Sequence, residues 1–184
     1  MKTLFCDKVF PYTGKELHSR FVREQTGLDG DAAIAWVGPC DVPNENLVDT
    51  EDRDAGEFIK AKSMLHFIVE VGEKDLLRAV YRQRLLVAIA ADAIREASGK
   101  MIERHGDDLF VGKGKLSVSI ATNSPTSTLI HLGINIDGTG APVKTSDLKA
   151  LGIDPKALAK TVLERFAAEE KGIRHAKSKV RPVP

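Results

Sequence analysis

The residues best suited to chemistry in this chain stand on one short stretch, GDDLFVGKGKLSVSIAT. Two adjacent carboxylates, Asp107 and Asp108, lead into an apolar run, and a Gly-Lys-Gly turn brings the chain back. The return strand begins at Lys115, and its alternation places Ser117 and Ser119 on one side with the lysine. Donors, acceptors and opposite charges gathered in this way are typical of a site that orients a polar ligand.

Two further predicted strands carry polar side chains on a matching side. In MLHFIVEV, His66 and Glu70 oppose a fully apolar side, and in LIHLGINID the same holds for His131 and Asn135. The apolar sides are expected to pack against helices, which leaves the polar sides together on the other face of one sheet. Serines, histidines and a glycine are not the residues preferred on a solvated strand face, so we expect a ligand-binding face. A face open to water is the alternative.

Spacing limits how these residues act together. His66 and Glu70 lie four residues apart on one strand, about 13 Å at the strand rise, so we expect them at opposite ends of a pocket and not as a pair. His66 taken alone is more often a structural histidine than a catalytic one. Arg84 falls near the apolar stripe of a predicted helix, where it is expected either to reach a carboxylate or to extend along the surface.

The elements that position these residues are strands and helices in mixed order. Strands are predicted at residues 1–12, 32–40, 64–71 and 129–137, besides the hairpin; Gly38-Pro39 is expected to end the second one. Helices are predicted at 73–97, ended by Ser98-Gly99, from Ser146 to Gly152, and for about four turns after Asp154-Pro155. The charged segment 41–63 is expected to be a partly helical connection. This order predicts an α/β (α+β) fold with a central mixed sheet and helices packed mainly on one face.

Composition narrows the class of protein. The 184 residues suit a single domain over 1–184, with a basic tail at roughly 171–184. The net charge of +1, from 27 basic and 26 acidic side chains, argues against nucleic acid as a partner. No apolar run approaches the ~20 residues of a membrane span, and no membrane partner is expected. With two cysteines, no zinc-type spacing and no signal-peptide pattern, we expect a reduced, cytoplasmic protein.

The hairpin, a spacer and IHLGINID together resemble the core signature of biotin and lipoate protein ligases. That signature has an Asn-Asp pair, an apolar strand, a Gly/basic turn, a lysine and a serine on the return strand; Asp107 falls at its Asn, Asp108 at its Asp and Lys115 at its lysine. Nearly the whole chain is similar to an uncharacterised prokaryotic domain-of-unknown-function family in that superfamily. The segments that carry this closer resemblance are YTGKELHSRF, VDTED, MLHFIVE, YRQRLL and GDDLFVGKGKLSVSIAT.

The ligase resemblance implies a chemistry and a set of roles. Acyl-adenylate formation builds negative charge on a carboxylate and on the α-phosphate of ATP, and a fixed cation between them stabilises the transition state. The resemblance gives that role to Lys115, and gives Asp108, with Asp107, a place at phosphate or Mg²⁺. Ser117 and Ser119 would border the acyl group or ribose. ATP, Mg²⁺, a small-molecule ligand, an acyl-carrier-type protein and a homo-oligomer are the implied cofactors and partners.

Departures from the ligase pattern keep other functions open. No Gly/Arg-rich loop precedes MLHFIVE; the segment there, VDTEDRDAGEF, is acidic and repels a triphosphate unless Mg²⁺ intervenes. Acyl transfer through a thioester would need Cys40, whose apolar neighbours are expected to raise its pKa. A catalytically silent module is the third possibility. It would bind a nucleotide, nucleobase or other metabolite on a sheet like that of class II aminoacyl-tRNA synthetases, in a groove with His66, Glu70 and Asn135.

Overall fold

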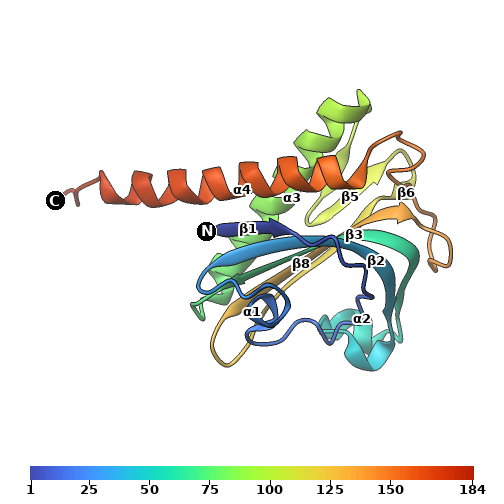
Figure 1. Ribbon diagram of the computed structural model, residues 1–184, viewed down its shortest axis with the longest axis horizontal. Helices are drawn as coiled ribbons and strands as arrows, with labels where there is room; N and C mark the ends of the chain where they lie inside the picture. Colours follow the sequence, from blue (N-terminus) through green and yellow to red (C-terminus); the bar gives the residue numbers. More distant parts are fainter.

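A five-stranded mixed sheet forms the centre of the computed structural model, which describes residues 1–184 (Figure 1). The strand order is β1-β2-β3-β8-β7, and only the β1–β2 pair is parallel. The predicted mixed sheet with helices is therefore confirmed. The strands are β1 (Lys2–Phe5), β2 (Ala32–Val42), β3 (Ile59–Val71), β8 (Thr128–Asp137) and β7 (Ser117–Asn123).

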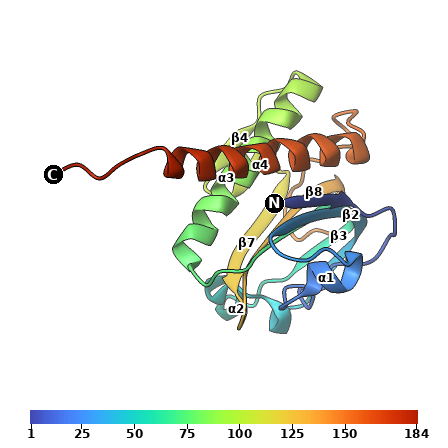
Figure 2. The same cartoon turned by 60° about the vertical axis from the view of Figure 1, so that its left-hand side comes forward.

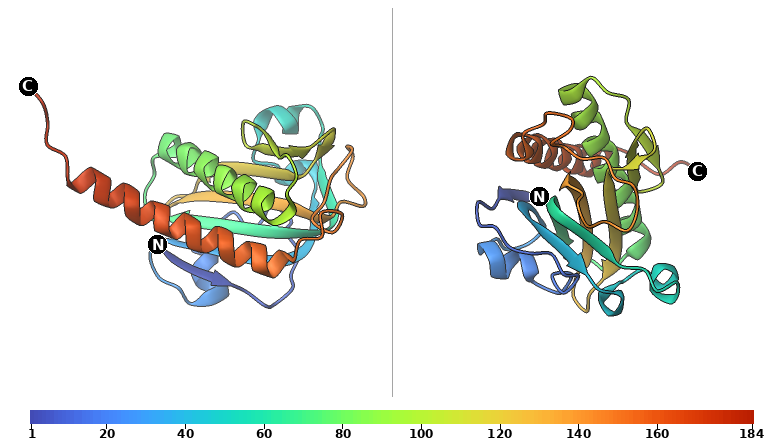
Figure 3. Two further views of the ribbon diagram at one scale, coloured as in Figure 1. Left: turned by 90° about the horizontal axis from the view of Figure 1, so that it is seen from above. Right: turned by 90° about the vertical axis from the view of Figure 1, so that its right-hand side faces the viewer.

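Two long helices, α3 (Leu76–Ser98) and α4 (Pro155–Ser178), cross one face of this sheet (Figure 3). Asp75 and Asp154 cap their N-termini through side-chain acceptors, and Gly99 ends α3 at a φ of 65°, as the Ser-Gly signal predicts. The last helix is longer than the predicted four turns, with 24 residues that include most of the basic tail. Neither helix is long and apolar enough to cross a membrane.

The core between helices and sheet follows the period-two pattern of β3 and β8. Leu65 and Phe67 of β3 and Leu132 and Ile134 of β8 are fully buried in one cluster with α3 and α4. Burying a side chain of this size contributes about 1.5–3 kcal/mol, which fixes the register of both strands. Their opposite sides, with His66 and His131, therefore face away from the helices, as expected.

The register of β7 differs from the expected one. Ser117 pairs with Ile134 and Ser119 with Leu132, so both serines point toward the helices and not toward the face that carries His131. The Ser117 hydroxyl accepts the Leu109 N–H at 3.0 Å, and Ser119 donates to the His131 carbonyl at 2.8 Å. These bonds satisfy the hydroxyls on the apolar side, which is why the alternation misleads here.

The other face of the sheet is covered over part of its area by the N-terminal segment and by α1 (Phe21–Thr26) (Figures 1 and 2). Phe10 stacks on Trp36 with a centroid distance of 4.5 Å, and the Trp36 indole donates to the Phe10 carbonyl at 3.0 Å. A Cβ at Gly38 would lie 1.8 Å from that carbonyl, so the close crossing needs glycine there. Gly38-Pro39 does not end β2, which continues past an irregularity to Val42.

Short elements complete the fold. The segment 41–63 contains η1 (Asn44–Asn46) and α2 (Thr50–Asp54), while β4 (Glu103–His105), β5 (Asp108–Val111) and β6 (Gly114–Lys115) form a small second sheet. The helix predicted from Ser146 to Gly152 is absent and turns replace it. The reason is that the Ser146 N–H donates to the Lys115 carbonyl and its hydroxyl to Val111, so Ser146 holds the hairpin and does not cap a helix.

Candidate functional site

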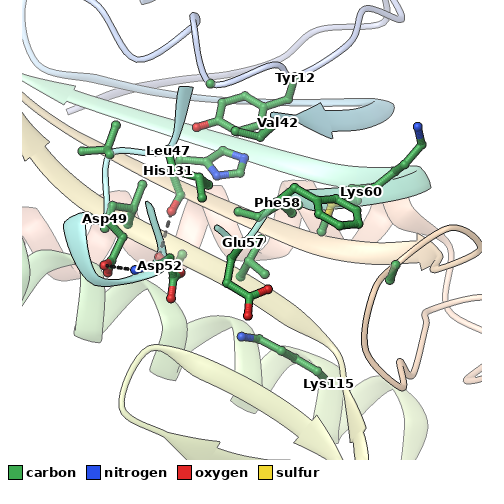
Figure 4. A pocket seen from close by; sticks show the side chains of 18 of the residues that line it. Tyr12, Val42, Leu47, Asp49, Asp52, Glu57, Phe58, Lys60, Lys115 and His131 are labelled. Carbon is green, nitrogen blue, oxygen red and sulfur yellow. Dashed lines mark hydrogen bonds between the residues drawn. The ribbon is translucent and has the colours of Figure 1, made fainter. Parts of the chain in front are cut away.

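A pocket of about 420 Å³ opens on the part of the sheet that α1 and the N-terminal segment leave uncovered (Figure 4). Its floor is formed by strands β3, β7 and β8, and its walls come from four segments far apart in sequence: Tyr12 with its neighbours, residues 46–60, the β5–β6 hairpin and residues 141–145. This volume lies within the range of small-molecule sites.

Two buried histidines of the floor form a hydrogen-bonded chain with a fixed direction. The His66 Nε2 lies 3.2 Å from the Gly38 carbonyl oxygen, which can only accept, so Nε2 carries the proton. Neutral His66 then accepts at Nδ1 from His131 Nε2, 3.1 Å away. Burial lowers the pKa of His66 to about 4 and that of His131 well below its ordinary range, which keeps both rings neutral. His131 is left with Nδ1 as an acceptor without a protein partner.

Tyr12 forms a lid over this histidine. Its ring is stacked on His131 with centroids 3.6 Å apart and planes 7° from parallel, and both side chains line the pocket at 3% exposure (Figure 4). Burial raises the pKa of the Tyr12 phenol well above 10, so the hydroxyl stays protonated. No protein group bonds to this hydroxyl. The pocket thus holds one donor and one acceptor on side chains that are about 97% buried, and both atoms are left to water or to a ligand in the pocket.

The predicted lysine and aspartate meet in the pocket wall. The Lys115 ammonium lies 2.8 Å from the Asp108 carboxylate, and both are about 30% exposed. Burial raises the pKa of Asp108 and the lysine opposes that rise. Asn135 also lines the pocket, but its amide donates to the Lys115 and Ser146 carbonyls at 3.1 and 3.3 Å. Asn135 therefore positions the lysine backbone and keeps only its carbonyl oxygen for a ligand.

Asp107 is tied to α3 behind the hairpin. Arg84 reaches it at 3.0 Å, which selects the carboxylate alternative for this arginine, and Gln83 donates to it at 2.8 Å and to the Ser119 hydroxyl at 3.1 Å. Arg84 does not line the pocket, and Ser119 lines it while its hydroxyl is engaged on the helix side. These residues fix the base of the hairpin.

Glu70, predicted at the far end of the pocket, lies outside it. Its carboxylate accepts the N–H groups of Arg20 and Val22 at 2.6 and 3.3 Å, and the Ser127 hydroxyl at 2.8 Å. Glu70 thus anchors the start of α1 in the covered part of the sheet. Ser117 is fully buried behind the hairpin, and His66 supports His131 without reaching the pocket itself.

Cys40 does not supply a reactive thiolate. The side chain is 1% exposed, and burial raises the pKa of its thiol to about 12. The thiolate is the nucleophilic form, so this position is unsuited to a thioester intermediate at neutral pH.

The strand pattern did not reveal Tyr12 or the pocket wall that residues 46–60 form. Asp49, Asp52, Glu57, Phe58 and Lys60 contribute to this wall. The run of acidic residues there is visible in the sequence, but its place opposite Lys115 follows only from the β2–β3 pairing. Nothing local marks Tyr12 as a lid, because the crossing at Gly38 puts it there.

The pocket is acidic. Five carboxylates line it (Asp49, Asp52, Glu57, Asp107 and Asp108) against two lysines, Lys60 and Lys115. Asp107 and Asp108 are engaged by Arg84 and Lys115, and no group of three or more side chains is placed to hold a metal ion. Mg²⁺ and a triphosphate at the two aspartates stay predictions, and a triphosphate in this acidic pocket would need Mg²⁺ between its phosphates and the carboxylates.

The sheet, the helices on one face and the pocket on the other define an architecture of the biotin protein ligase type. A biotin protein ligase from Aquifex aeolicus, in complex with biotin and ATP, superposes with a TM-score of 0.59 at 14% identity, over 92% of this chain and 70% of the ligase. The family model described as a domain of unknown function (DUF366) matches residues 1–181, and the chain belongs to that family.

Two further proteins are similar to this chain, one in structure and one in sequence. A protein of unknown function from Pyrococcus horikoshii superposes with a TM-score of 0.94 at 34% identity, over 100% of this chain and 99% of that one. The uncharacterized protein MJ0805 of Methanocaldococcus jannaschii is 36% identical over 159 residues, which cover 83% of this chain and 72% of the relative.

Proposed function

We propose that this protein binds a small metabolite in the pocket beneath Tyr12 and that binding does not depend on ATP. The observation that carries the proposal is that two largely buried side chains of the pocket, Tyr12 and His131, each keep one polar atom, the hydroxyl and Nδ1, without a protein partner. In the free protein these two atoms are left to water, and a ligand that displaces this water while keeping both hydrogen bonds gains a defined orientation in the pocket. A ligand with an N–H or O–H donor for the imidazole and a polar atom that accepts from, or donates to, the phenol oxygen matches both.

The histidine chain supports selectivity as well as binding. His66 and the Gly38 carbonyl fix which nitrogen of His131 is the acceptor, so the pocket discriminates against a ligand that offers only acceptors at that point. Asn135 adds a carbonyl oxygen, and Phe58 and Val143 place half-exposed apolar surface at the pocket walls. A planar heterocycle with ring N–H groups, of nucleobase size, combines these features.

A second function is favoured by one contact. The Lys115–Asp108 pair occupies the place where the ligase resemblance implies the catalytic lysine, and its ammonium faces the pocket. Acyl-adenylate formation or acyl transfer would use this cation to stabilise developing negative charge. The excess of carboxylates in the pocket speaks against ATP and makes this the weaker candidate.

Thermal-shift measurements with two pairs of variants separate the functions. Wild type, Tyr12→Phe and Lys115→Ala are each screened with nucleobases, ATP-Mg²⁺, biotin, lipoate and fatty acids. At a hundredfold excess over Kd, a ligand adds about 2.7 kcal/mol to the free energy of unfolding. We expect a heterocycle to stabilise wild type, to act about tenfold more weakly on Tyr12→Phe, and to be little affected by Lys115→Ala.

The controls are Tyr81→Phe, at an exposed tyrosine of α3, and Lys113→Ala, in the turn of the same hairpin. Stabilisation by ATP-Mg²⁺ that disappears in Lys115→Ala but not in Lys113→Ala, with pyrophosphate release on addition of an acid, would establish the ligase function instead. A heterocycle response that Tyr12→Phe leaves unchanged would remove the pocket from the proposal.

A further inference from the structure

Some of the carboxylates that line the pocket are paired with a cation or with N–H groups, and others have no partner in the protein. Asp107 and Asp108 are paired with Arg84 and Lys115, and Asp49 caps α2 by accepting from the N–H groups of Glu51 and Asp52. The side chains of Asp52 and Glu57 form no ion pair and no hydrogen bond, although both line the pocket. Lys60 does not compensate for them, because its ammonium is 3.5 Å from Asp41, a carboxylate outside the lining.

The free carboxylates face the same space as the predicted lysine. Figure 4 shows Glu57 and Lys115 extending into the pocket from opposite walls, yet their charged groups do not form an ion pair. Asp52 of α2 and Asp108 of the hairpin both line this pocket, so α2 and the hairpin lie on either side of one cavity. Burial is the main cause of the raised pKa of Asp108, and the nearby Asp52 adds to it. The cavity therefore keeps a negative potential that its own lysines leave uncancelled.

We infer that the ligand of this pocket is a cation with N–H donors, of the amidinium, guanidinium or protonated amino-heterocycle class. The inference rests on the proposed binding function and adds the sign of the charge. Two independent features lead to it: the unpaired carboxylates of Asp52 and Glu57, and the acceptor nitrogen of His131, a side chain that is 97% buried in the floor of the same pocket. A planar N–H cation satisfies both, since it donates to the imidazole and lies between carboxylates. Apolar surface at Phe58 suits the hydrocarbon part of such a molecule.

The experiment compares three probes of one shape that differ in charge: benzamidine, benzamide and benzoate. Binding is followed by shifts of the Tyr12 and His131 backbone amides in ¹H–¹⁵N NMR spectra, which report both affinity and place. We expect benzamidine to bind about tenfold more tightly than benzamide, and benzoate to bind least. Added salt should weaken the binding of benzamidine and leave that of benzamide nearly unchanged.

Matched variants locate the charge. Asp52→Asn and Glu57→Gln should each weaken the binding of benzamidine by about threefold, as expected for exposed carboxylates, without changing the binding of benzamide. Asp54→Asn is the control, because Asp54 is an exposed carboxylate on the same helix and does not line the pocket. An equal effect of Asp54→Asn would mean that only the overall charge of the protein matters, and would overturn the inference.

The remaining outcomes separate this inference from the proposed function. Equal binding of benzamide and benzamidine at Tyr12, or tightest binding of benzoate, shows a real ligand site and refutes the cation preference. If none of the three probes shifts these amides, the cation preference is also wrong, and the nucleobase screen with Tyr12→Phe decides the binding function separately.

Discussion

The sheet face opposite the two long helices has two parts that contain similar residues and differ in how those residues are satisfied. In the covered part, Glu70 is buried and accepts from three donors supplied by α1 and the β7–β8 turn. In the open part, Tyr12 and His131 are buried to a similar degree, yet each keeps a polar atom without a protein partner. A buried polar side chain is therefore a poor guide to function, whereas incomplete hydrogen bonding within a cavity points to a ligand.

The largest expected effect comes from breaking the covered part. Glu70→Ala leaves the Arg20 and Val22 N–H groups and the Ser127 hydroxyl without an acceptor, so we expect the free energy of unfolding to fall by about 4 kcal/mol. Urea denaturation measures this loss, and Glu45→Ala, at an exposed glutamate of η1, should change stability by less than about 0.5 kcal/mol. A small loss in Glu70→Ala would mean that the two parts of the face are not different in kind.

Lowering the pH tests the buried pair His66 and His131 in the open part of the face. The folded-state pKa of His66, about 4, and that of His131 lie below the ordinary value of 6.5, so the unfolded chain binds more protons as the pH falls. The two neutral histidines leave the free energy of unfolding undiminished above the ordinary pKa. Below it, the free energy of unfolding falls, by about 1.4 kcal/mol for each histidine at about pH 5.5. Denaturation midpoints measured across this range provide the check.

The controls for the acid effect use one buried and one exposed histidine. His66→Gln should make the stability of the protein less dependent on pH between about 6.5 and 4, because one of the two buried titrating groups is gone. His175→Gln, in the exposed last turns of α4, should leave the pH dependence as in wild type. Identical curves for His66→Gln and wild type would show that the buried pair does not govern acid unfolding.

Much of the fold could be predicted from the sequence, and the failures have physical causes. Strands β3 and β8 follow their alternation because their apolar sides are large and continuous, as Phe67 and Leu132 illustrate. In β7 the pattern is ambiguous: small serines bonded to backbone occupy the helix side, while Val118 and Ile120 line the pocket. The ligase resemblance succeeded for the fold because it rested on a whole hairpin and the following strand.

The candidate site was less accessible to sequence reasoning, because its key contacts join residues far apart in the chain. Lys115 and Asp108 could be paired within one hairpin, and the structure brings them together. The lid formed by Tyr12 depends on a crossing at Gly38, and the acidic wall depends on where the β2–β3 connection folds back. Glu70 shows the reverse error: its type and strand position fit a binding face, but α1 occupies that part of the face.

The smallest expected change in stability is also the sharpest test of the open part. Tyr12→Phe removes a hydroxyl that bonds to no protein group and retains the ring stacked on His131, so we expect the free energy of unfolding to change by less than about 0.5 kcal/mol. A loss above about 1 kcal/mol would mean that the hydroxyl has a structural partner, and the covered and open parts would then be equivalent. Near-neutral stability combined with the tenfold loss of heterocycle binding would instead separate the role of the phenol in recognition from its role in the fold, because the same substitution leaves every packed contact of the ring in place.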